Sequence, residues 1–308
     1  MENHPLVSVI TVNYNQSAVT LALLDSLTRV TYPRVEVIVV DNASANDPVD
    51  RIAELHPEVR LIRSPENLGF AGGNNLGIRE AKGAYLFFLN NDTEVPPGIM
   101  EPLVDLLEAH PEIGAVSPKI RYFDQPDLVQ YAGFTRMNPW TVRNNAVGYR
   151  QPDGPEYGNL TATHSIHGAA MMVPARVVAE VGLMPEVYFL YYEEHDWAEM
   201  IKRAGYKLYC QPASVVLHKE SVSTGRNSPF ITYYLARNRL LFARRNFRGL
   251  PFLFSMIFHI FVSVPKNAGQ FLLTGRTAHL KAYLRGIGWH LSAGNSVHTK
   301  NKSYGDRG

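Results

Sequence analysis

The sequence predicts an α/β protein with a doubly wound, mostly parallel sheet and helices on both faces. Three observations lead to this fold class: short β-branched runs that end in polar residues, segments with helical apolar spacing between them, and the regular alternation of the two along the first 120 residues. Such alternation builds a parallel sheet, because right-handed crossovers carry each helix back over the sheet. With 308 residues the chain can bury one large core or two modest ones.

The first strand–helix–strand unit sets the pattern. Residues 6–11 and 35–40 are apolar runs typical of buried parallel strands, and residues 18–29 between them have the spacing of a helix. We expect the alternation to continue with a helix at 48–56, a strand at 59–63, a helix at 72–81, a strand at 84–89, a helix at 97–110 and a strand at 113–117.

The second half of the chain is less regular. From residue 119 to about 163 the periodicity fades and Gly, Pro, Asn and aromatic residues accumulate, so we interpret this stretch as loops over the active face. Further elements are expected as a strand at 168–173, a helix at 174–181, a helix at 196–205, strands at 207–209 and 214–217, and a helix at 230–248. We therefore predict a catalytic domain over residues 1–228 and a helical C-terminal region over residues 229–308.

Charge is distributed unevenly along the chain. Residues 1–220 carry 17 Lys and Arg against 27 Asp and Glu, whereas residues 221–308 carry 13 basic residues and a single acid, Asp306. Such a basic tail predicts an anionic partner, either a membrane surface or nucleic acid. A basic face that serves only solubility is the alternative.

The tail also contains a nearly continuous apolar run, residues 250–264. Fifteen residues fall short of the roughly 20 that a membrane-spanning helix needs. With its basic and aromatic flanks, the run predicts a helix lying on an anionic leaflet, with residues 230–290 as the membrane-facing region and no nucleic-acid partner. The alternative is a terminal helix packed on the catalytic domain or in a homodimer interface.

Cysteine usage and the first residues bear on the compartment. The single cysteine, Cys210, excludes an internal disulfide and a cysteine-based zinc site, and fits a reducing compartment. Residues 1–5 lack the basic and then apolar layout of a secretory signal. We expect a cytoplasmic protein that is peripheral at the inner face of the plasma membrane.

Polar residues follow the first two predicted strands. Val12-Asn13-Tyr14-Asn15 ends the first strand, and Asp41 and Asn42 end the second. The carboxyl ends of parallel strands line one edge of the sheet, where α/β proteins bind ligands. There Asp41 could accept hydrogen bonds from a base or ribose while Tyr14 packs against the base. The alternative is that Asp41-Asn42 only caps the next helix.

The segment from Asn67 to Asn75 is rich in Gly and Asn and precedes a predicted helix. Glycine permits close backbone approach, and a helix amino terminus attracts phosphate. The segment matches neither the phosphate-binding loop with its Gly-Lys pair nor the GxGxxG dinucleotide fingerprint. This argues against an ATPase or a dehydrogenase.

Asn90-Asn91-Asp92 directly follows the buried run 84–89. At the carboxyl end of a strand, Asp92 could hold a hard divalent cation, which would in turn hold a diphosphate. Asn-Asp is also ordinary turn chemistry.

An acidic cluster, Glu193-Glu194-His195-Asp196, precedes the predicted helix at 196–205. A carboxylate here could accept a proton from an acceptor hydroxyl, although acids are also favoured at a helix amino terminus, the role we expect for Asp196. His218 ends the last predicted strand and could add an imidazole to the Asp92 metal site, but a lone histidine is more often structural.

Taken in order, these motifs resemble glycosyltransferase family 2, over about residues 5–245. The resemblance rests on Val-x-Tyr-Asn from Val12, Val-Asp-Asn-x-Ser from Val40, Asn-x-Gly-x-x-x-Gly-Asn from Asn67 to Asn74, Leu-Asn-x-Asp ending at Asp92, the Glu-Glu-x-Asp cluster and the later histidine. The resemblance implies a GT-A fold and inversion at the anomeric carbon. The subgroup that the chain resembles is the bacterial rhamnosyltransferase-like enzymes of cell-surface polysaccharide assembly.

Residue by residue, the resemblance implies that Val12, Tyr14 and Asp41 hold the nucleoside, with Asn67 and Asn74 nearby. Asn90-Asn91-Asp92 corresponds to the family's Asp-x-Asp metal motif, and Asn90 replaces its first acid. Asp92 is then the main protein carboxylate on a Mg²⁺ or Mn²⁺ ion, with His218 and the diphosphate completing the shell.

Glu194 occupies the position of the family's catalytic base, which is often an Asp, and the neighbouring Glu193 leaves the choice between them open. If one glutamate raises the pKa of the other by like-charge repulsion, the base is tuned toward neutral pH. The expected donor is a nucleotide sugar, first dTDP-rhamnose and then UDP-sugars, and the expected acceptor is a saccharide, with a polyprenyl-diphosphate-linked one favoured by the basic, apolar tail.

Two other functions share some of these features. A nucleotidyltransferase acting on sugar phosphates uses a similar sheet but usually needs a basic, Gly-rich loop, and residues 12–18 contain no Lys or Arg. A non-catalytic module binding anionic membranes or nucleic acid would account for the tail alone.

Overall fold

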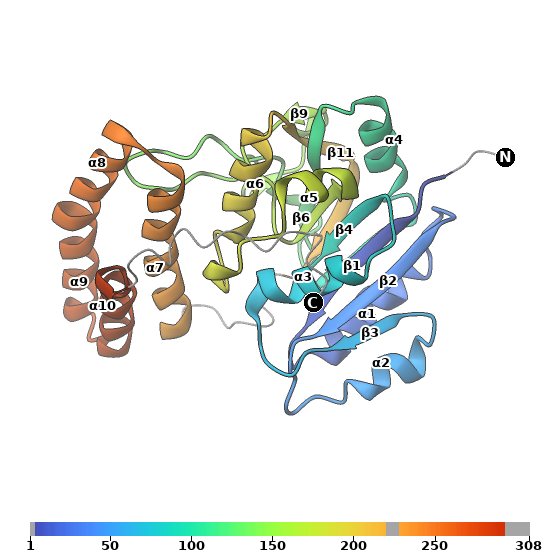
Figure 1. Cartoon of the computed structure of the whole chain (residues 1–308), viewed down its shortest axis with the longest axis horizontal. Helices are drawn as coiled ribbons and strands as arrows, with labels where there is room; N and C mark the ends of the chain where they lie inside the picture. Colours follow the sequence, from blue (N-terminus) through green and yellow to red (C-terminus); the bar gives the residue numbers. More distant parts are fainter. Residues whose placement is uncertain (1–3, 220–227, 293–308) are drawn as a thin grey trace.

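The computed structural model describes residues 4–219 and 228–292. In these ranges the chain forms one 11-stranded sheet with helices on both faces, and a layer of helices stands beside it (Figure 1). The strand order is β3-β2-β1-β4-β10-β6-β11-β5, with β7, β8 and β9 at its side. The predicted α/β fold is confirmed.

The first half of the chain follows the predicted alternation. β1 pairs in parallel with β2 and β4, and β2 pairs in parallel with β3. The elements in this half are β1 (Val7–Asn13), α1 (Ser17–Leu27), β2 (Val35–Asp41), α2 (Asp50–Leu55), β3 (Arg60–Arg63), α3 (Gly69–Glu80), β4 (Tyr85–Leu89), β5 (Thr93–Glu94) and α4 (Glu101–Ala109).

The second half adds antiparallel strands to the sheet. β10 runs antiparallel to β4 and to β6, whereas β11 runs parallel to β6. The elements are β6 (Ile113–Tyr122), β7 (Leu128–Tyr131), β8 (Gln151–Pro152), η1 (Pro155–Tyr157), β9 (Thr161–Ala162), β10 (Ala170–Pro174), α5 (Ala175–Val181), η2 (Glu186–Tyr188), α6 (Glu193–Arg203) and β11 (Lys207–His218).

Strand periodicity divides the core between the two faces of the sheet. In β4, Phe87 and Leu89 point into the cluster under α1 and α4, whereas Leu86 and Phe88 point into the cluster under α3, α5 and α6. The ring of Trp197 from α6 packs edge-to-face on Phe88, 5.6 Å between centroids. Burial on both faces explains why this strand is continuously apolar.

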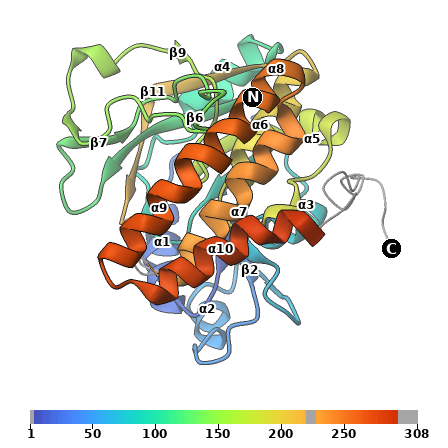
Figure 2. The same ribbon diagram turned by 90° about the vertical axis from the view of Figure 1, so that its left-hand side faces the viewer.

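A helical layer follows, made of α7 (Pro229–Asn246), α8 (Gly249–Phe258), a π-helical turn (His259–Ser263), α9 (Val264–Leu273) and α10 (Thr277–Ser292). Figures 1 and 2 show α7 next to the sheet domain and α8, α9 and α10 outside it. α7 contacts α6, and α10 packs along α7. Residues 1–3, 220–227 and 293–308 of the two predicted domains lie outside the described part.

Three expectations about secondary structure were wrong. Residues 119–163 are not only loops, because β6 continues to Tyr122 and β7, β8 and β9 lie within the stretch. The two strands expected at 207–209 and 214–217 are one strand, β11, which carries a register shift between Gln211 and Val215. The 15-residue apolar run is part of one helical rod of 25 residues, Gly249–Leu273, in which the π-helical turn His259–Ser263 directly precedes Pro265.

That helical rod is long and apolar enough to cross a membrane by length and composition, and only 17% of its most apolar window is buried. Length and composition alone are weak evidence for a span, since a signal sequence or a core helix passes the same test.

Candidate active site

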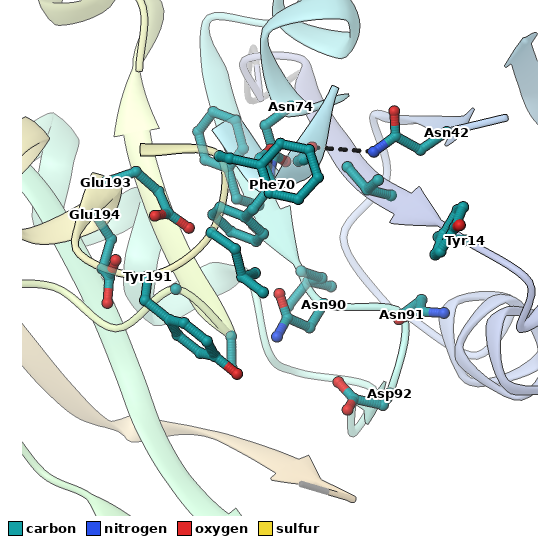
Figure 3. Close-up of a pocket in the computed structure, with 18 of the residues that line it drawn as sticks. Tyr14, Asn42, Phe70, Asn74, Asn90, Asn91, Asp92, Tyr191, Glu193 and Glu194 are labelled. Carbon is teal, nitrogen blue, oxygen red and sulfur yellow. Dashed lines mark hydrogen bonds between the residues drawn. The ribbon is translucent and has the colours of Figure 1, made fainter. Parts of the chain in front are cut away.

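A cavity of about 610 Å³ opens at the carboxyl ends of β1 and β4, beside the first turn of α6. Figure 3 shows Tyr14, Asn90, Asn91 and Asp92 on one side of it and Glu193 and Glu194 on the other. It is therefore the cavity that the strand-end motifs predicted. Of the predicted site residues, those that line it are Val12, Tyr14, Asn67, Asn74, Asn90, Asn91, Asp92, Glu193, Glu194 and His218.

Asp92 and His218 are brought together by strand pairing. β5 pairs antiparallel with the end of β11, His218 opposite Thr93, and Asp92 directly precedes β5. The backbone N–H of Lys219 donates to the Asp92 carbonyl at 2.8 Å. As a result, His218 Nε2 lies 3.1 Å from Asp92 Oδ1 at the cavity wall.

The surroundings of this pair fit a divalent cation. His218 Nδ1 lies 2.8 Å from Oε1 of Gln130, an oxygen that accepts a hydrogen bond, so Nε2 is the ring nitrogen that faces the Asp92 carboxylate. An imidazole nitrogen and a carboxylate oxygen placed in this way can share a proton or a bound cation. A histidine oriented by an amide oxygen is also the usual outer shell of a metal ligand. Within the described residues no cluster of three or more His, Cys, Asp or Glu side chains could hold a metal by itself.

Asn90 and Asn91 belong to a tight turn between β4 and β5. The N–H of Thr93 donates to the Asn90 carbonyl at 3.1 Å, so the turn chemistry considered as an alternative is present. The Asn91 amide donates to Thr20 Oγ1 at 3.2 Å, whereas the side chain of Asn90 extends into the cavity (Figure 3).

The far end of the cavity is lined by Tyr14 and by amide side chains. Tyr14 is 42% exposed, so its ring is available for stacking. Asn42, which the sequence analysis did not select, donates to Asn67 Oδ1 at 3.0 Å and accepts from the Leu68 N–H at 2.9 Å. Asn74 donates to the Phe70 carbonyl at 2.9 Å.

Asp41 lies beside the cavity but is not among its lining residues. Its Oδ1 accepts from Asn13 Nδ2 at 3.0 Å and from Ser44 Oγ at 2.5 Å. This carboxylate therefore ties the end of β1 to the end of β2. It does not cap a helix, because α2 begins only at Asp50.

The Gly/Asn-rich segment is not an open phosphate loop. Gly69, Gly72 and Gly73 lie inside α3, and a Cβ on Gly73 would come within 2.9 Å of a Val12 methyl. At the amino terminus of α3, the N–H groups of Gly69 and Phe70 donate to Asn67 Oδ1 and to the Phe189 carbonyl. The glycines thus serve close packing, and these amide groups are already satisfied.

Glu193 and Glu194 begin α6 after a strained turn. Phe189, Tyr191 and Tyr192 all have positive φ values, of 67°, 68° and 76°. Such conformations cost free energy in non-glycine residues and persist only where the surroundings enforce them. The turn aims both glutamates into the cavity (Figure 3).

Two side chains of α7 hold this turn. The Asn238 amide donates to the carbonyls of Tyr188, Leu190 and Tyr191 at 3.0, 2.7 and 2.9 Å. The Arg237 guanidinium donates to the carbonyls of Val187 and Tyr188 at 2.5 and 2.7 Å. We call these two residues the α7 clamp. Its contacts satisfy carbonyls that the irregular backbone leaves free.

The two glutamates have different environments. Glu193 is buried, and burial, reinforced by the charge of Glu194, raises its pKa well above the usual value. Its Oε2 has no hydrogen-bond partner in the described residues. Glu194 lies 3.7 Å from His195 Nε2, and His195 Nδ1 is 2.7 Å from Ser165 Oγ.

Asp196 lies in the first turn of α6, where the sequence placed it, although its side chain makes no capping hydrogen bond. It is fully buried, and its carboxylate accepts from Arg245 and Asn246 of α7 at 2.5 and 2.7 Å, so it also joins two helices. Arg237 and Arg245 therefore face the protein interior, which corrects the expectation that the α7 arginines as a group face an anionic membrane.

Several lining residues were missed because no local motif marks them. His167 precedes β10, and burial, with the charges of His218 and His195, lowers its pKa to about 3. Gln130 comes from β7, within the stretch interpreted as loops. The other missed residues of the lining that carry aromatic rings are Phe70, Phe88, Phe189, Tyr191 and Phe230.

The fold defines the class: a GT-A-like protein, whose cavity carries carboxylate, imidazole and amide groups at the strand ends. The family model "Glycosyl transferase family 2" matches residues 8–170, and the chain belongs to that family.

Two of the relatives have names that state an activity or a process. The N-acetylglucosaminyl-diphospho-decaprenol L-rhamnosyltransferase of Mycobacterium tuberculosis is 27% identical over 252 residues, which cover 72% of this chain and 78% of that protein. The O-antigen biosynthesis protein RfbC of Myxococcus xanthus is 27% identical over 75% of this chain and 19% of its own length.

Solved structures share the fold at low identity. The mannosyltransferase PcManGT from Pyrobaculum calidifontis, in complex with GDP-Man and Mn²⁺, superposes with a TM-score of 0.55 at 21% identity, over 95% of this chain and 77% of that one. Residues 1–349 of S. aureus TarS give a TM-score of 0.57 at 14% identity, over 94% and 82%.

Proposed function

We propose that this protein transfers a sugar from a nucleoside diphosphate sugar to a hydroxyl group of a saccharide, with inversion at the anomeric carbon. The observation that carries the proposal is the placement of the Asp92–His218 pair and the Glu193–Glu194 pair across one cavity. dTDP-rhamnose is the first candidate donor, because a relative is named as a rhamnosyltransferase acting in a diphospho-decaprenol pathway. UDP-sugars are next.

The donor is proposed to lie along the strand ends. Tyr14, Asn42 and Asn67 surround the end suited to the nucleoside, with Asn74 and Asp41 close by, and Asn90 and Asn91 lie beside the diphosphate. Asp92 and His218 would hold Mg²⁺ or Mn²⁺, which when bound neutralises charge on the departing diphosphate. Because the protein supplies only two ligands, oxygens of the nucleotide sugar and water would complete the coordination shell.

The base is proposed to be Glu194. Burial disfavours the charged form of Glu193, whereas Glu194 is the more accessible of the two carboxyl groups at the cavity, so Glu194 is the better placed acceptor. Glu194 takes the proton of the acceptor hydroxyl as its oxygen bonds to the anomeric carbon from the face opposite the leaving group. The bond between that carbon and the phosphate oxygen breaks, and its electron pair leaves with the nucleoside diphosphate.

The acceptor is proposed to be membrane-borne, a saccharide on a polyprenyl diphosphate in cell-surface polysaccharide synthesis. Support comes from the outer face of the 249–273 helical rod, where Leu253, Ile260 and Phe261 are 50%, 58% and 72% exposed. Arg248, Lys266 and Arg276 near this face are exposed and suit an anionic leaflet. The proposed location is the cytoplasmic face of the membrane.

The Glu194→Gln variant tests the proposal. Transfer should fall by about 10²–10⁴-fold, the usual worth of a general base, while nucleoside diphosphate binding measured by calorimetry remains. Glu193→Gln is the matched control and should retain much more activity. Near-normal transfer by Glu194→Gln, or release of pyrophosphate as in a nucleotidyltransferase, would refute the proposal.

A further inference from the structure

The helical rod Gly249–Leu273 has a polar stripe on its inner side. Ser255, His259 and Ser263 recur every four residues and are buried, although their neighbours along the rod are apolar and exposed. His259 is 3% exposed, and its Nδ1 donates to the Ser255 carbonyl at 2.8 Å. Its Nε2 is buried with no hydrogen-bond partner in the described residues. Buried polar atoms are usually hydrogen-bonded, so this ring nitrogen is a candidate for binding a ligand.

Two arginines face this stripe from other elements. Arg239 lies on α7, and Arg143 lies on the loop between β7 and β8. Their charges are close enough that Arg239, aided by burial, lowers the pKa of Arg143. Burial lowers the pKa of His259, and the charges of Arg239 and Arg143 act in the same direction. α7, the loop between β7 and β8, and the helical rod thus each place a basic side chain in the same region.

Hydrogen bonds and packing contacts hold Arg143 and Arg239 in place. The loop carrying Arg143 is closed by a hydrogen bond from the Asn138 N–H to the Arg143 carbonyl, 2.8 Å, and Val142 is fully buried. Trp140 of the same loop stacks on Phe254 of α8, 4.6 Å between centroids. Arg239 Nε donates to the Tyr192 hydroxyl at 3.1 Å, and that hydroxyl donates to the Val142 carbonyl at 2.8 Å.

The two guanidinium groups have no acidic partner among the described residues. In the parts of the chain that are described, no ion pair joins Arg143 or Arg239 to an acid, and residues 221–305 contain no Asp or Glu. The neighbouring Asp196 is already bound by Arg245. Two close guanidinium groups without a counterion repel each other, and a bound anion would remove that cost.

We propose that Arg143 and Arg239, with His259, bind the diphosphate of a lipid-linked acceptor. Two planar guanidinium groups match two phosphoryl groups by paired hydrogen bonds. His259 adds a donor at Nε2 when its ring is protonated, a state that an anion beside it favours. The exposed apolar face of the same rod suits the lipid chain, which distinguishes this ligand from free phosphate.

The site is linked to the catalytic turn. Tyr192, whose hydroxyl contacts Arg239, immediately precedes Glu193 and Glu194. A diphosphate held here would place the attached saccharide on the side of the molecule where the glutamates lie. The inference rests on the proposed function for the identity of the acceptor, but not for the existence of the anion site.

Binding of farnesyl diphosphate, measured by calorimetry in EDTA, tests the site. EDTA removes any cation from the Asp92–His218 pair. We expect Arg143→Gln and Arg239→Gln each to weaken binding by about tenfold or more, since each removes charged hydrogen bonds. Arg51→Gln, which removes the same charge from an exposed position on α2, should change it less than about twofold. Farnesol and inorganic diphosphate should bind more weakly to the unaltered protein.

If all three variants lose the same affinity for farnesyl diphosphate, binding depends only on overall positive charge and the proposed site is wrong. Unchanged affinity in Arg143→Gln and Arg239→Gln would also overturn it. Loss of phosphatidylglycerol vesicle binding with intact farnesyl diphosphate binding would assign the arginines to lipid head groups and also overturn it. If Arg239→Gln fails to fold because it loses the Tyr192 contact, the exposed Arg143→Gln decides. The experiment measures binding and no sugar transfer. The anion site can therefore be confirmed or refuted even if the proposed transferase function is wrong.

Discussion

Glu193 and Glu194 are adjacent in sequence, yet the structure gives them different environments. Glu193 is buried at the start of α6 and has a raised pKa, whereas Glu194 lies next to His195 at the cavity. The like-charge repulsion expected from the sequence contributes to the raised pKa of Glu193, but burial contributes more. Because burial disfavours a negative charge on Glu193, the charge that the donor diphosphate would meet is also limited.

The raised pKa of Glu193 predicts how the stability of the protein depends on pH. In the unfolded chain Glu193 titrates near about 4.3. Between that pH and the higher pKa of the folded protein, the folded state retains a proton that the unfolded state has lost, so stability falls as pH rises. Glu193→Gln should therefore melt at a higher temperature than the unaltered protein at pH 7, and the difference should shrink as the pH approaches about 4.

Thermal melts over this pH range provide the measurement. Glu54→Gln, at an exposed position, is the matched control and should leave the pH dependence unchanged. Identical pH profiles for Glu193→Gln and the unaltered protein would contradict a buried, protonated Glu193.

Gln130 is a residue-level test of the metal pair. It contacts His218 Nδ1 and does not touch the proposed ion, so Gln130→Ala should weaken Mn²⁺ affinity by about 10–100-fold while metal-free nucleotide binding stays the same. Gln151→Ala on β8 is exposed and serves as the control. Mn²⁺ titration followed by electron paramagnetic resonance measures the effect, and unchanged affinity would argue against His218 as a ligand.

At the scale of elements, α7 connects the helical layer to the active site. The α7 clamp, Arg237 and Asn238, binds the turn before α6, and Arg245 and Asn246 bind Asp196 within α6. Arg237 is itself enclosed by Tyr234 and Trp289, each ring centroid 5.0 Å from its guanidinium carbon. The orientation of the glutamates therefore depends on a helix that lines little of the cavity.

Asn238→Ala should expose that dependence. The variant removes the amide that donates to the Leu190 and Tyr191 carbonyls, while the Tyr188 carbonyl keeps Arg237, so we expect unfolding to require about 1–3 kcal/mol less, with a lower kcat and little change in KM for the donor. Denaturant unfolding and steady-state kinetics measure both effects. Asn159→Ala, an exposed asparagine, should change neither, and a normal kcat in Asn238→Ala would show that the turn is held by other contacts.

Sequence reasoning found elements with a clear period and missed elements defined by distant partners. β1, β2 and β4 and their helices were predicted because their apolar runs and polar strand ends are local signals. β7 and β9 are short and become strands only through pairing with β6 and β11. The site shows the same division: Asp92, His218 and the glutamates stand at motif positions, whereas Gln130 and Asn238 act through contacts made only in the folded chain.

At the scale of the whole molecule, the helical layer stands beside the sheet domain (Figures 1 and 2). The cavity is lined mainly by residues of the sheet domain and also by Ser228 and Phe230 at the start of α7. The apolar outer face of the 249–273 rod stands on the side away from the sheet. This arrangement suits an enzyme that takes a soluble donor on the sheet side and a lipid-borne acceptor on the helical side.

Membrane attachment can be tested without truncation, which would remove the Trp289 contacts of α10 with Arg237. The double variant Ile260→Gln with Phe261→Gln removes two exposed side chains from the rod and should weaken partition onto vesicles of phosphatidylglycerol and phosphatidylcholine by at least about tenfold. Leu55→Gln with Leu160→Gln changes exposed leucines elsewhere and is the control. Equal cosedimentation of both double variants would exclude the rod as the attachment surface.

The most direct test of the central claim is a crystal of the protein soaked with nucleoside diphosphate and Mn²⁺, with anomalous diffraction to locate the metal. We expect one strong anomalous peak between Asp92 and His218, in contact with the diphosphate and facing Glu194 across the cavity. A bound nucleotide whose manganese lies elsewhere, or a nucleotide outside this cavity, would contradict the proposed site.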